Sequence, residues 1–116
     1  MKNDNYKALL PKDFPKELIK LAYNLEPIGI AEIAWKSKDI IKVVDFFVDK
    51  GYAILGGDVY SLNGKELEST YDNWYINNPL SQSLLEESRK KACKYIDEHV
   101  KNNGDYYVYS IVFELV

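Results

Sequence analysis

The amino-acid sequence predicts an α+β fold, in which a mostly antiparallel sheet of three to four strands packs with three helices. Three observations support this fold. Apolar residues recur at helical spacing in two segments before residue 50 and in one after residue 80. Residues 52–77 read as two strands joined by a turn, without an intervening helix, and the last twelve residues alternate like a strand. The expected order is helix, helix, strand, strand, helix, strand.

The first helix is expected over roughly residues 15–24. Pro15 suits the first helical position, and Leu18, Ile19 and Ala22 recur at helical spacing. Pro27 ends this helix, because the residue before a proline is disfavoured in the α region. Residues 30–35, IAEIAW, fit either a short strand or the start of the next helix, and the sequence leaves both interpretations open.

A second helix is expected from Ser37 to Lys50. Ser37 is a candidate N-cap, Asp39 lies in the first turn where the helix dipole favours an acid, and Gly51 suits the position after the C-cap. Its apolar stripe is wide enough to predict a well-buried helix. The stripe consists of Ile40, Ile41, Val43, Val44, Phe46, Phe47 and Val48.

The next segments predict a hairpin, a long helix and a final strand. Residues 52–60 read as a strand, Asn63-Gly64 is typical of a tight turn, and residues 69–77 read as the returning strand, with irregular pairing or a longer loop at residues 66–68. The third helix is expected from Ser81 or Ser83 to about Asn102. The final strand should place one apolar row on a single face: Tyr107, Tyr109, Ile111, Phe113 and Leu115.

Length and composition limit the classes of protein that remain. The 116 residues, 47% of them hydrophobic, predict one globular domain over 1–116. No stretch resembles a signal peptide or a membrane span, so a cytoplasmic protein is expected. Cys93 and His99 are the sole residues of their types, so neither a disulfide nor a Cys/His zinc site is expected. No metal or other cofactor is expected.

The charge distribution indicates which partners are favourable. The net charge is −3, and residues 59–116 carry six Lys and Arg against nine acids, whereas residues 1–58 balance nine against nine. Nucleic acid is therefore not expected as a partner, because phosphate binding requires a basic surface. A basic protein is the electrostatically easier partner.

The segment GYAILGGDVY, residues 51–60, contains a glycine pair followed by an acid. Phosphate-binding glycine loops open a helix, whereas Gly56 and Gly57 are followed by the strand-like Val59 and Tyr60. Glycine within a strand usually marks a β-bulge or a close approach by another group. We therefore expect a structural bend, with Asp58 beside two missing side chains and thus in an open depression.

Strand alternation predicts an aromatic and acidic face on the sheet. In residues 71–77, Tyr71 and Tyr75 share the face opposite Trp74. Asp58 and Tyr60 should share a face with Tyr52, unless a bulge changes the alternation between the two ends of the strand. Tyrosine is frequent at interface hot spots, so this face is a candidate binding surface; the alternative is that a helix covers it.

The residues offer few candidates for catalysis. His99 and Cys93 lie beside the apolar stripe of the third helix, and packing roles are expected for both. A hydrolase that uses paired carboxylates from Glu32, Asp58 and Asp72 is an alternative. The sequence spacing does not show whether any two of these approach each other, and we do not expect an enzyme.

The run AWKSKDIIKVVDFFVDKGYAILGGDVY, together with YDNWYIN, resembles the immunity protein 40 family of bacterial polymorphic-toxin systems. The resemblance extends over roughly residues 28–77, with a weaker likeness in the last helix and strand. It implies a small cytosolic protein that binds and neutralises a cognate toxin.

The predicted function therefore combines this resemblance with the sheet face. An acidic, tyrosine-rich surface would cover the basic active-site cleft of a toxin. A self-associating module, in which the tyrosine face closes a homodimer, is a further alternative. The predicted partner-binding residues are Glu32, Trp35, Asp58, Tyr60, Tyr71, Asp72 and Tyr75.

Overall fold

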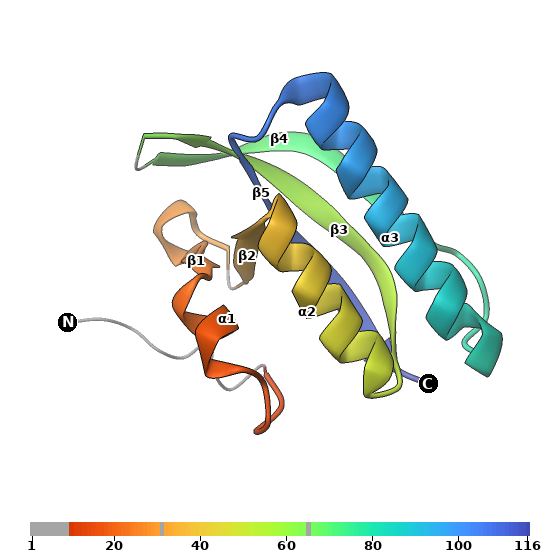
Figure 1. The fold of residues 1–116 in the computed structure, drawn as a ribbon. Helices are drawn as coiled ribbons and strands as arrows, with labels where there is room; N and C mark the ends of the chain where they lie inside the picture. The colour runs from red at the N-terminus through yellow and green to blue at the C-terminus, as the bar shows by residue number, and fades with distance from the viewer. Residues whose placement is uncertain (1–9, 31, 65) are drawn as a thin grey trace.

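The computed structural model describes residues 10–30, 32–64 and 66–116. Figure 1 shows helices packed on one sheet, whose strands follow the order β1-β2-β5-β3-β4 with every neighbouring pair antiparallel. The strands are β1 (Tyr23–Asn24), β2 (Ile33–Lys36), β3 (Tyr52–Asn63), β4 (Glu66–Tyr75) and β5 (Tyr107–Leu115). The helices are α1 (Lys16–Lys20), α2 (Ser37–Asp49) and α3 (Gln82–Asn103), with a 3-10 turn η2 (Glu26–Ile28). The α+β class and the three helices are confirmed, whereas the sheet has five strands, more than expected.

The strands β1 and β2, which bring the number above the expected three to four, lie near the N-terminus. The first helix ends at Lys20, earlier than its apolar spacing predicts, because the chain then forms β1 against β2, with Tyr23 opposite Ala34. The amide of Leu25 also donates to the carbonyl of Glu32, 3.0 Å away. The open question about residues 30–35 is resolved, since β2 begins at Ile33 and leads directly into α2.

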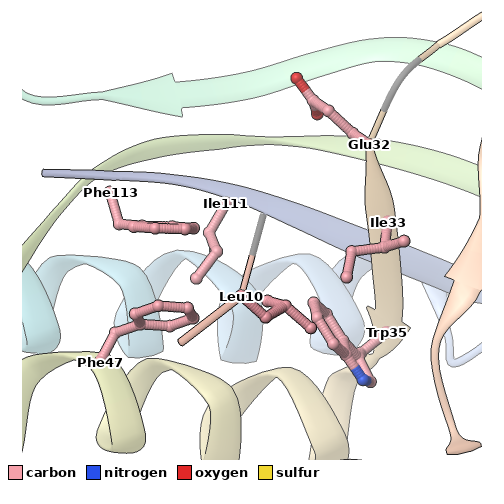
Figure 2. A pocket seen from close by; sticks show the side chains of 7 residues that line it. All are labelled: Leu10, Glu32, Ile33, Trp35, Phe47, Ile111 and Phe113. Atoms are coloured by element: carbon pink, nitrogen blue, oxygen red, sulfur yellow. The ribbon is translucent and has the colours of Figure 1, made fainter. Parts of the chain in front are cut away.

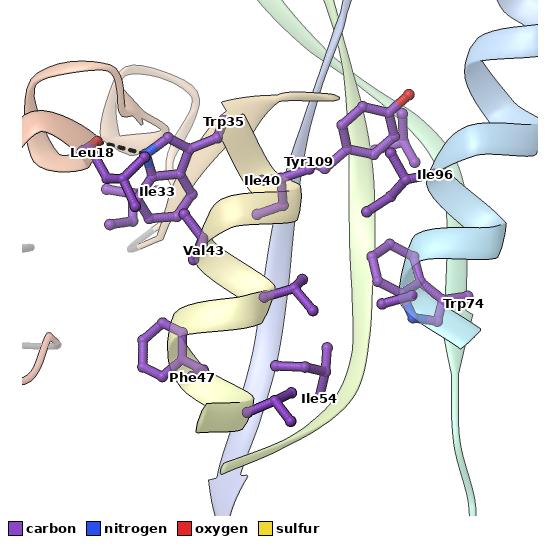
Figure 3. Packing of buried hydrophobic residues seen from close by; sticks show 14 of the residues in the cluster. Leu18, Ile33, Trp35, Ile40, Val43, Phe47, Ile54, Trp74, Ile96 and Tyr109 are labelled. Atoms are coloured by element: carbon purple, nitrogen blue, oxygen red, sulfur yellow. Dashed lines mark hydrogen bonds between the residues drawn. The ribbon is translucent and has the colours of Figure 1, made fainter. Parts of the chain in front are cut away.

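The main core lies between the sheet and the helices. Figure 2 shows Leu10 beside Phe47 of α2 and Trp35 of β2, below the ribbon of β5. The Trp35 indole donates a 2.7 Å hydrogen bond to the carbonyl of Leu18, which ties α1 to this core (Figure 3). Burial of large side chains of this kind contributes about 2 kcal/mol each. The fully buried members include Phe47, Ile40, Val43, Val44, Ile54, Val59, Ile96 and Tyr109.

Helix α3 is joined to both β3 and α2 by polar contacts. The buried Ser88 hydroxyl accepts a 3.0 Å hydrogen bond from the amide of Ile54 and donates one to the carbonyl of Leu85. Arg89 pairs with Asp45 and Asp49 of α2. These contacts fix the two long helices side by side on one face of the sheet (Figure 1). None of the helices in the described ranges is both long and apolar enough to span a membrane.

The opposite face of the sheet, which we call the open face, carries a second and smaller apolar cluster. Leu25, from the segment before η2, packs there with Ala34, Tyr60 and Val108. The remaining alternate positions of β3, β4 and β5 are not covered by α2 or α3. The question of whether a helix covers the tyrosine face therefore has a mixed answer: the 3-10 segment buries Tyr60, and the part near β4 stays exposed.

The hairpin between β3 and β4 is paired closer to its turn than the sequence predicts, with β3 extending to Asn63 and β4 ending at Tyr75. Pairing next to the turn is regular, with Asn63 opposite Glu66 and Leu62 opposite Leu67, so β4 begins three residues earlier than expected. The irregularity lies farther along, between Ser69 and Asn73. Because the two strands pair directly from the turn onward, residues 66–68 belong to the strand in spite of their charge.

Candidate functional site

The glycine pair in β3 marks both a bulge and a close approach, as the sequence predicts. The register between β3 and β5 shifts between Ile54 and Gly56, which leaves Leu55 as the extra residue. A Cβ atom on Gly56 would overlap the carbonyl oxygen of Trp74, and one on Gly57 would overlap the Ser110 carbonyl and the Trp74 ring. The glycines therefore allow three strands and an indole to pack without intervening side chains.

The bulge changes which β3 side chains face the helices. Tyr52 packs edge-on against Phe47 of α2, so it lies on the helix-covered face. Beyond Leu55 the alternation is shifted, and Val59 joins the helix-side core while Asp58 and Tyr60 point to the open face. The expectation that Tyr52 shares a face with Asp58 and Tyr60 is therefore wrong. The cause is a bulge that changes the alternation within the strand, which is the exception named with the prediction.

A shallow hollow forms on the open face above the two glycines. Asp58 lies opposite Asn73 of β4 and Ser110 of β5, and Gly56 lies opposite Tyr75 and Val112. We call this the glycine hollow; its lining residues are Leu55, Gly56, Gly57, Asp58, Asn73, Trp74, Tyr75, Ile76 and Val112. Its rim contains two exposed apolar side chains, with Tyr75 70% exposed and Val112 46% exposed. The hollow thus places the Asp58 carboxylate beside the exposed side chains of Tyr75 and Val112.

A second acid lies on the same face as Asp58. Figure 2 shows the Glu32 carboxylate pointing away from the core residues Leu10 and Phe47, on the other side of the β5 ribbon. The hydroxyl of Tyr60 experiences both acids, because burial, Asp58 and Glu32 all raise its pKa, while the nearby Ser110 hydroxyl opposes that rise. Glu32 and Asp58 therefore flank the positions of Tyr60 and Ser110 on the open face.

Two of the predicted contact residues are buried. Trp35 is 2% exposed and Tyr60 is 4% exposed, and both belong to apolar clusters. These side chains pack the sheet and position their neighbours, so we do not include them in the proposed contact surface below. Their aromatic character did not by itself distinguish an interface residue from a core residue.

Tyr71 lies in an irregular section of β4 at the edge of the sheet. Thr70, Tyr71 and Asp72 stand opposite the single residue Val59, and Tyr71 has a φ of 66°. The Thr70 hydroxyl closes this bulge by donating to the carbonyl of Val59 and accepting from the amide of Asp72, at 2.8 and 3.1 Å. Tyr71 is consequently 87% exposed.

Asp72 lies on the helix-covered side, away from the other two predicted acids. Its Oδ2 atom is 3.4 Å from Nε2 of His99, a buried residue of α3. The alternative of a carboxylate enzyme that uses Glu32, Asp58 and Asp72 together is therefore wrong in its geometry, because the sheet separates Asp72 from the others. In the described parts of the chain, no three His, Cys, Asp or Glu side chains come together as a metal site would require.

His99 and Cys93 occupy packing positions. The His99 Nδ1 atom is 2.9 Å from the Tyr109 hydroxyl, and its ring lies among Tyr95, Tyr107 and Tyr109. The Nε2 contact with Asp72 is close enough for an ion pair but lacks hydrogen-bond geometry. Burial and the carboxylates of Asp45 and Asp97 raise the pKa of the Cys93 thiol, which keeps it neutral and unreactive near pH 7.

Two buried tyrosines, Tyr60 and Tyr109, and the half-buried Cys93 and Tyr95 predict a loss of stability at alkaline pH. Burial is the largest cause of the raised pKa of each of these groups. The pKa of Tyr60, Tyr95 and Tyr109 lies above the usual 10.0 for tyrosine, and that of Cys93 lies above the usual 9.0 for cysteine. Because the unfolded chain ionises first, their contribution is complete below pH 9 and decreases as pH rises through 9 to 11. Urea midpoints measured from pH 7 to 11 should decrease, and Tyr109→Phe should reduce the slope above pH 9. An unchanged midpoint over this range would contradict the burial of these groups.

Sequence reasoning missed Ser110 as a candidate site residue. It is 1% exposed, and its hydroxyl makes no hydrogen bond of normal geometry with the described residues. A serine inside an otherwise apolar strand was the available signal, but only the register with Asp58 shows that it faces the acids. Asn73 gains its importance from the same register, which places it opposite Asp58.

The fold and this surface define a small α+β protein with one helix-covered and one partly open sheet face, whose open face bears a shallow hollow. The family model for immunity protein 40 matches residues 24–113. The chain therefore belongs to the immunity protein 40 family, as the resemblance in the sequence indicated. None of the curated proteins is significantly similar to the chain.

Proposed function

We propose that this protein neutralises a cognate bacterial toxin by binding it directly through the open face of the sheet. Membership of a family of immunity proteins supports the function. We propose the open face as the binding surface because of the glycine hollow, where Asp58 lies beside the exposed ring of Tyr75. A carboxylate next to an exposed tyrosine combines charge recognition with a large contact area.

Charge supports a basic cleft on the toxin as the surface that is covered. The net charge of −3 favours association with a basic protein. On the open face, Glu32 and Asp58 supply negative charge, while the exposed tyrosines Tyr71 and Tyr75 lie on β4 at one edge. The proposed contact residues are thus Glu32, Asp58, Tyr71 and Tyr75, with Asn73 between the last two. A toxin whose active site binds anionic substrates would present a complementary surface, and the protein would be found in the cytoplasm with it.

Co-expression with the toxin encoded beside this gene tests the proposal. The wild-type protein should restore growth and co-purify with the toxin. Asp58→Lys should weaken binding at least tenfold, because it removes an attraction and introduces a like charge, and about 1.4 kcal/mol corresponds to tenfold. Affinity is measured by titration calorimetry with a catalytically inactive toxin.

Glu87→Lys is the matched control. Glu87 is an exposed acid of α3, on the side of the molecule that bears the helices, so this charge reversal should leave affinity within about twofold of wild type. If neither growth nor co-purification is observed with the wild type, the proposed function is wrong. If Asp58→Lys and Glu87→Lys bind equally well, toxin binding uses another surface.

A further inference from the structure

The open face contains polar groups that are buried without the partners they require. The Ser110 hydroxyl and the Oε1 atom of Glu32 are both buried, and neither has a hydrogen-bond partner of normal geometry among the described residues, although the Tyr60 hydroxyl lies near Ser110. Buried polar atoms in folded proteins are nearly always paired, and each unpaired group destabilises the fold. Two such atoms on one face, with Asp58 beside them, indicate that an external donor belongs there.

The strand register brings these groups together. Asp58 of β3 lies directly opposite Ser110 of β5, and β5 lies between β3 and β2. On the other side of β5, Trp35 lies opposite Tyr109, and Glu32 precedes β2 by one residue. Ser110 is therefore on the middle strand, with Asp58 directly opposite it on β3 and Glu32 just before β2, two residues before Ala34 on the other side. Strands about 4.8 Å apart allow two such side chains to reach the same bound group.

The surroundings of Tyr60 also support the proximity of Ser110, Asp58 and Glu32. Its hydroxyl lies near Ser110 and within the electrostatic influence of both Asp58 and Glu32. It is buried with Ala34 and Val108, which forms an apolar wall on one side. Lys36 is the basic residue on β2, yet it forms no ion pair with either acid within the described chain. Within the described residues, the two carboxylates are thus left without a cation from the protein.

We infer that Glu32, Asp58 and Ser110 form a receptor for one guanidinium group, supplied by an arginine side chain of the toxin. This inference rests on the proposed function and specifies its central contact. Arginine presents five N–H donors in a planar fork, which suits two carboxylates and a hydroxyl on the same face of the sheet. A lysine ammonium has three donors on a compact head and would leave more of the acceptors unpaired. The stem of the arginine would lie along the glycine hollow, against Tyr75 and Val112.

Titration with ethylguanidinium, followed by amide NMR of the isolated protein, tests the receptor without the toxin. We expect saturable shifts centred on Asp58, Ser110 and Glu32, with propylammonium binding several-fold more weakly. Glu32→Gln and Asp58→Asn should each weaken ethylguanidinium binding about fivefold or more, because each removes a charge-assisted hydrogen bond. Glu87→Gln is the matched control and should bind like wild type.

Ser110→Ala separates binding from folding. Removing an unpaired buried hydroxyl should not lower the melting temperature, yet it should weaken ethylguanidinium binding several-fold. Shifts that are spread over all exposed acids, or that are unchanged in Glu32→Gln and Ser110→Ala, would overturn the inference. So would tight, localised binding of Mg²⁺ or Ca²⁺ with none for ethylguanidinium.

The outcome is distinguishable from that of the proposed function. If the toxin is neutralised but ethylguanidinium does not bind at Ser110, the receptor is refuted and the wider binding surface stands. If ethylguanidinium binds as expected but the toxin is neither bound nor neutralised, the receptor stands and the proposed function is refuted.

Discussion

Replacing Gly57 with alanine should destabilise the protein by about 3 kcal/mol or more, because the new methyl group enters a fully packed site. Its Cβ atom would overlap the carbonyl oxygen of Ser110 on one side and the Trp74 ring on the other. The first neighbour is backbone of a central strand and cannot rotate away. Equilibrium unfolding in urea, followed by circular dichroism, measures the effect.

Gly64→Ala is the control for this substitution. Gly64 lies in the β3–β4 turn with a φ of 66° and with open space around the position of a Cβ atom. Alanine there should cost about 1 kcal/mol, from the left-handed backbone alone. Equal losses in the two variants would show that steric overlap at Gly57 is relieved by movement of β5 or Trp74, and would contradict the close packing described above.

Replacing Tyr75 with alanine should weaken toxin binding about 30-fold while leaving stability within about 0.5 kcal/mol of wild type. The side chain is 70% exposed and stands at the rim of the glycine hollow, so it contributes contact area to a partner rather than to the core. A loss of about 2 kcal/mol is typical of a tyrosine at the centre of an interface. Calorimetric titration of an inactive toxin gives the affinity, and urea unfolding gives the stability.

Tyr106→Ala provides the matched comparison. Tyr106 is equally exposed, at 78%, but it precedes β5 and lies beside Ser61 and Asn63, at the hairpin end of the sheet. Its replacement should change toxin affinity less than threefold. If Tyr106→Ala is the more damaging variant, the contact surface is centred on the hairpin end and not on the glycine hollow.

The sequence predicted those parts of the fold that depend on local patterns. The wide apolar stripe of α2 and the alternation of β5 lead to the observed elements, since these segments bury one face by themselves. The glycine pair was correctly interpreted as a bulge because no helix follows it. In contrast, β1 has two residues and exists through its pairing with β2, a tertiary contact that no local pattern encodes.

The site was only partly predictable for a related reason. Asp58 and Tyr75 could be found because missing side chains and strand alternation indicate an open position. Tyr60 and Trp35 were assigned to the surface, although segments distant in sequence bury them, Leu25 covering the first and Leu18 contacting the second. Asp72 was grouped with Asp58, although the alternation that places Trp74 on the helix-covered side places Asp72 there too. The bulge at Leu55, in contrast, moves Tyr52 to the face opposite Asp58. The face on which a strand residue lies can thus be predicted from alternation up to the point where a bulge shifts the alternation.

The irregular section of β4 also limits how the exposed edge of the sheet can pair with another strand. As an edge strand, β4 has outward main-chain groups that would otherwise serve as a template for another chain. Thr70, Tyr71 and Asp72 interrupt that row, and the interruption is held by the hydrogen bonds of the Thr70 hydroxyl. A second copy can therefore align only a short length of backbone on either side. This edge therefore offers little continuous backbone for strand addition, so contacts with another protein would rely on side chains of the open face.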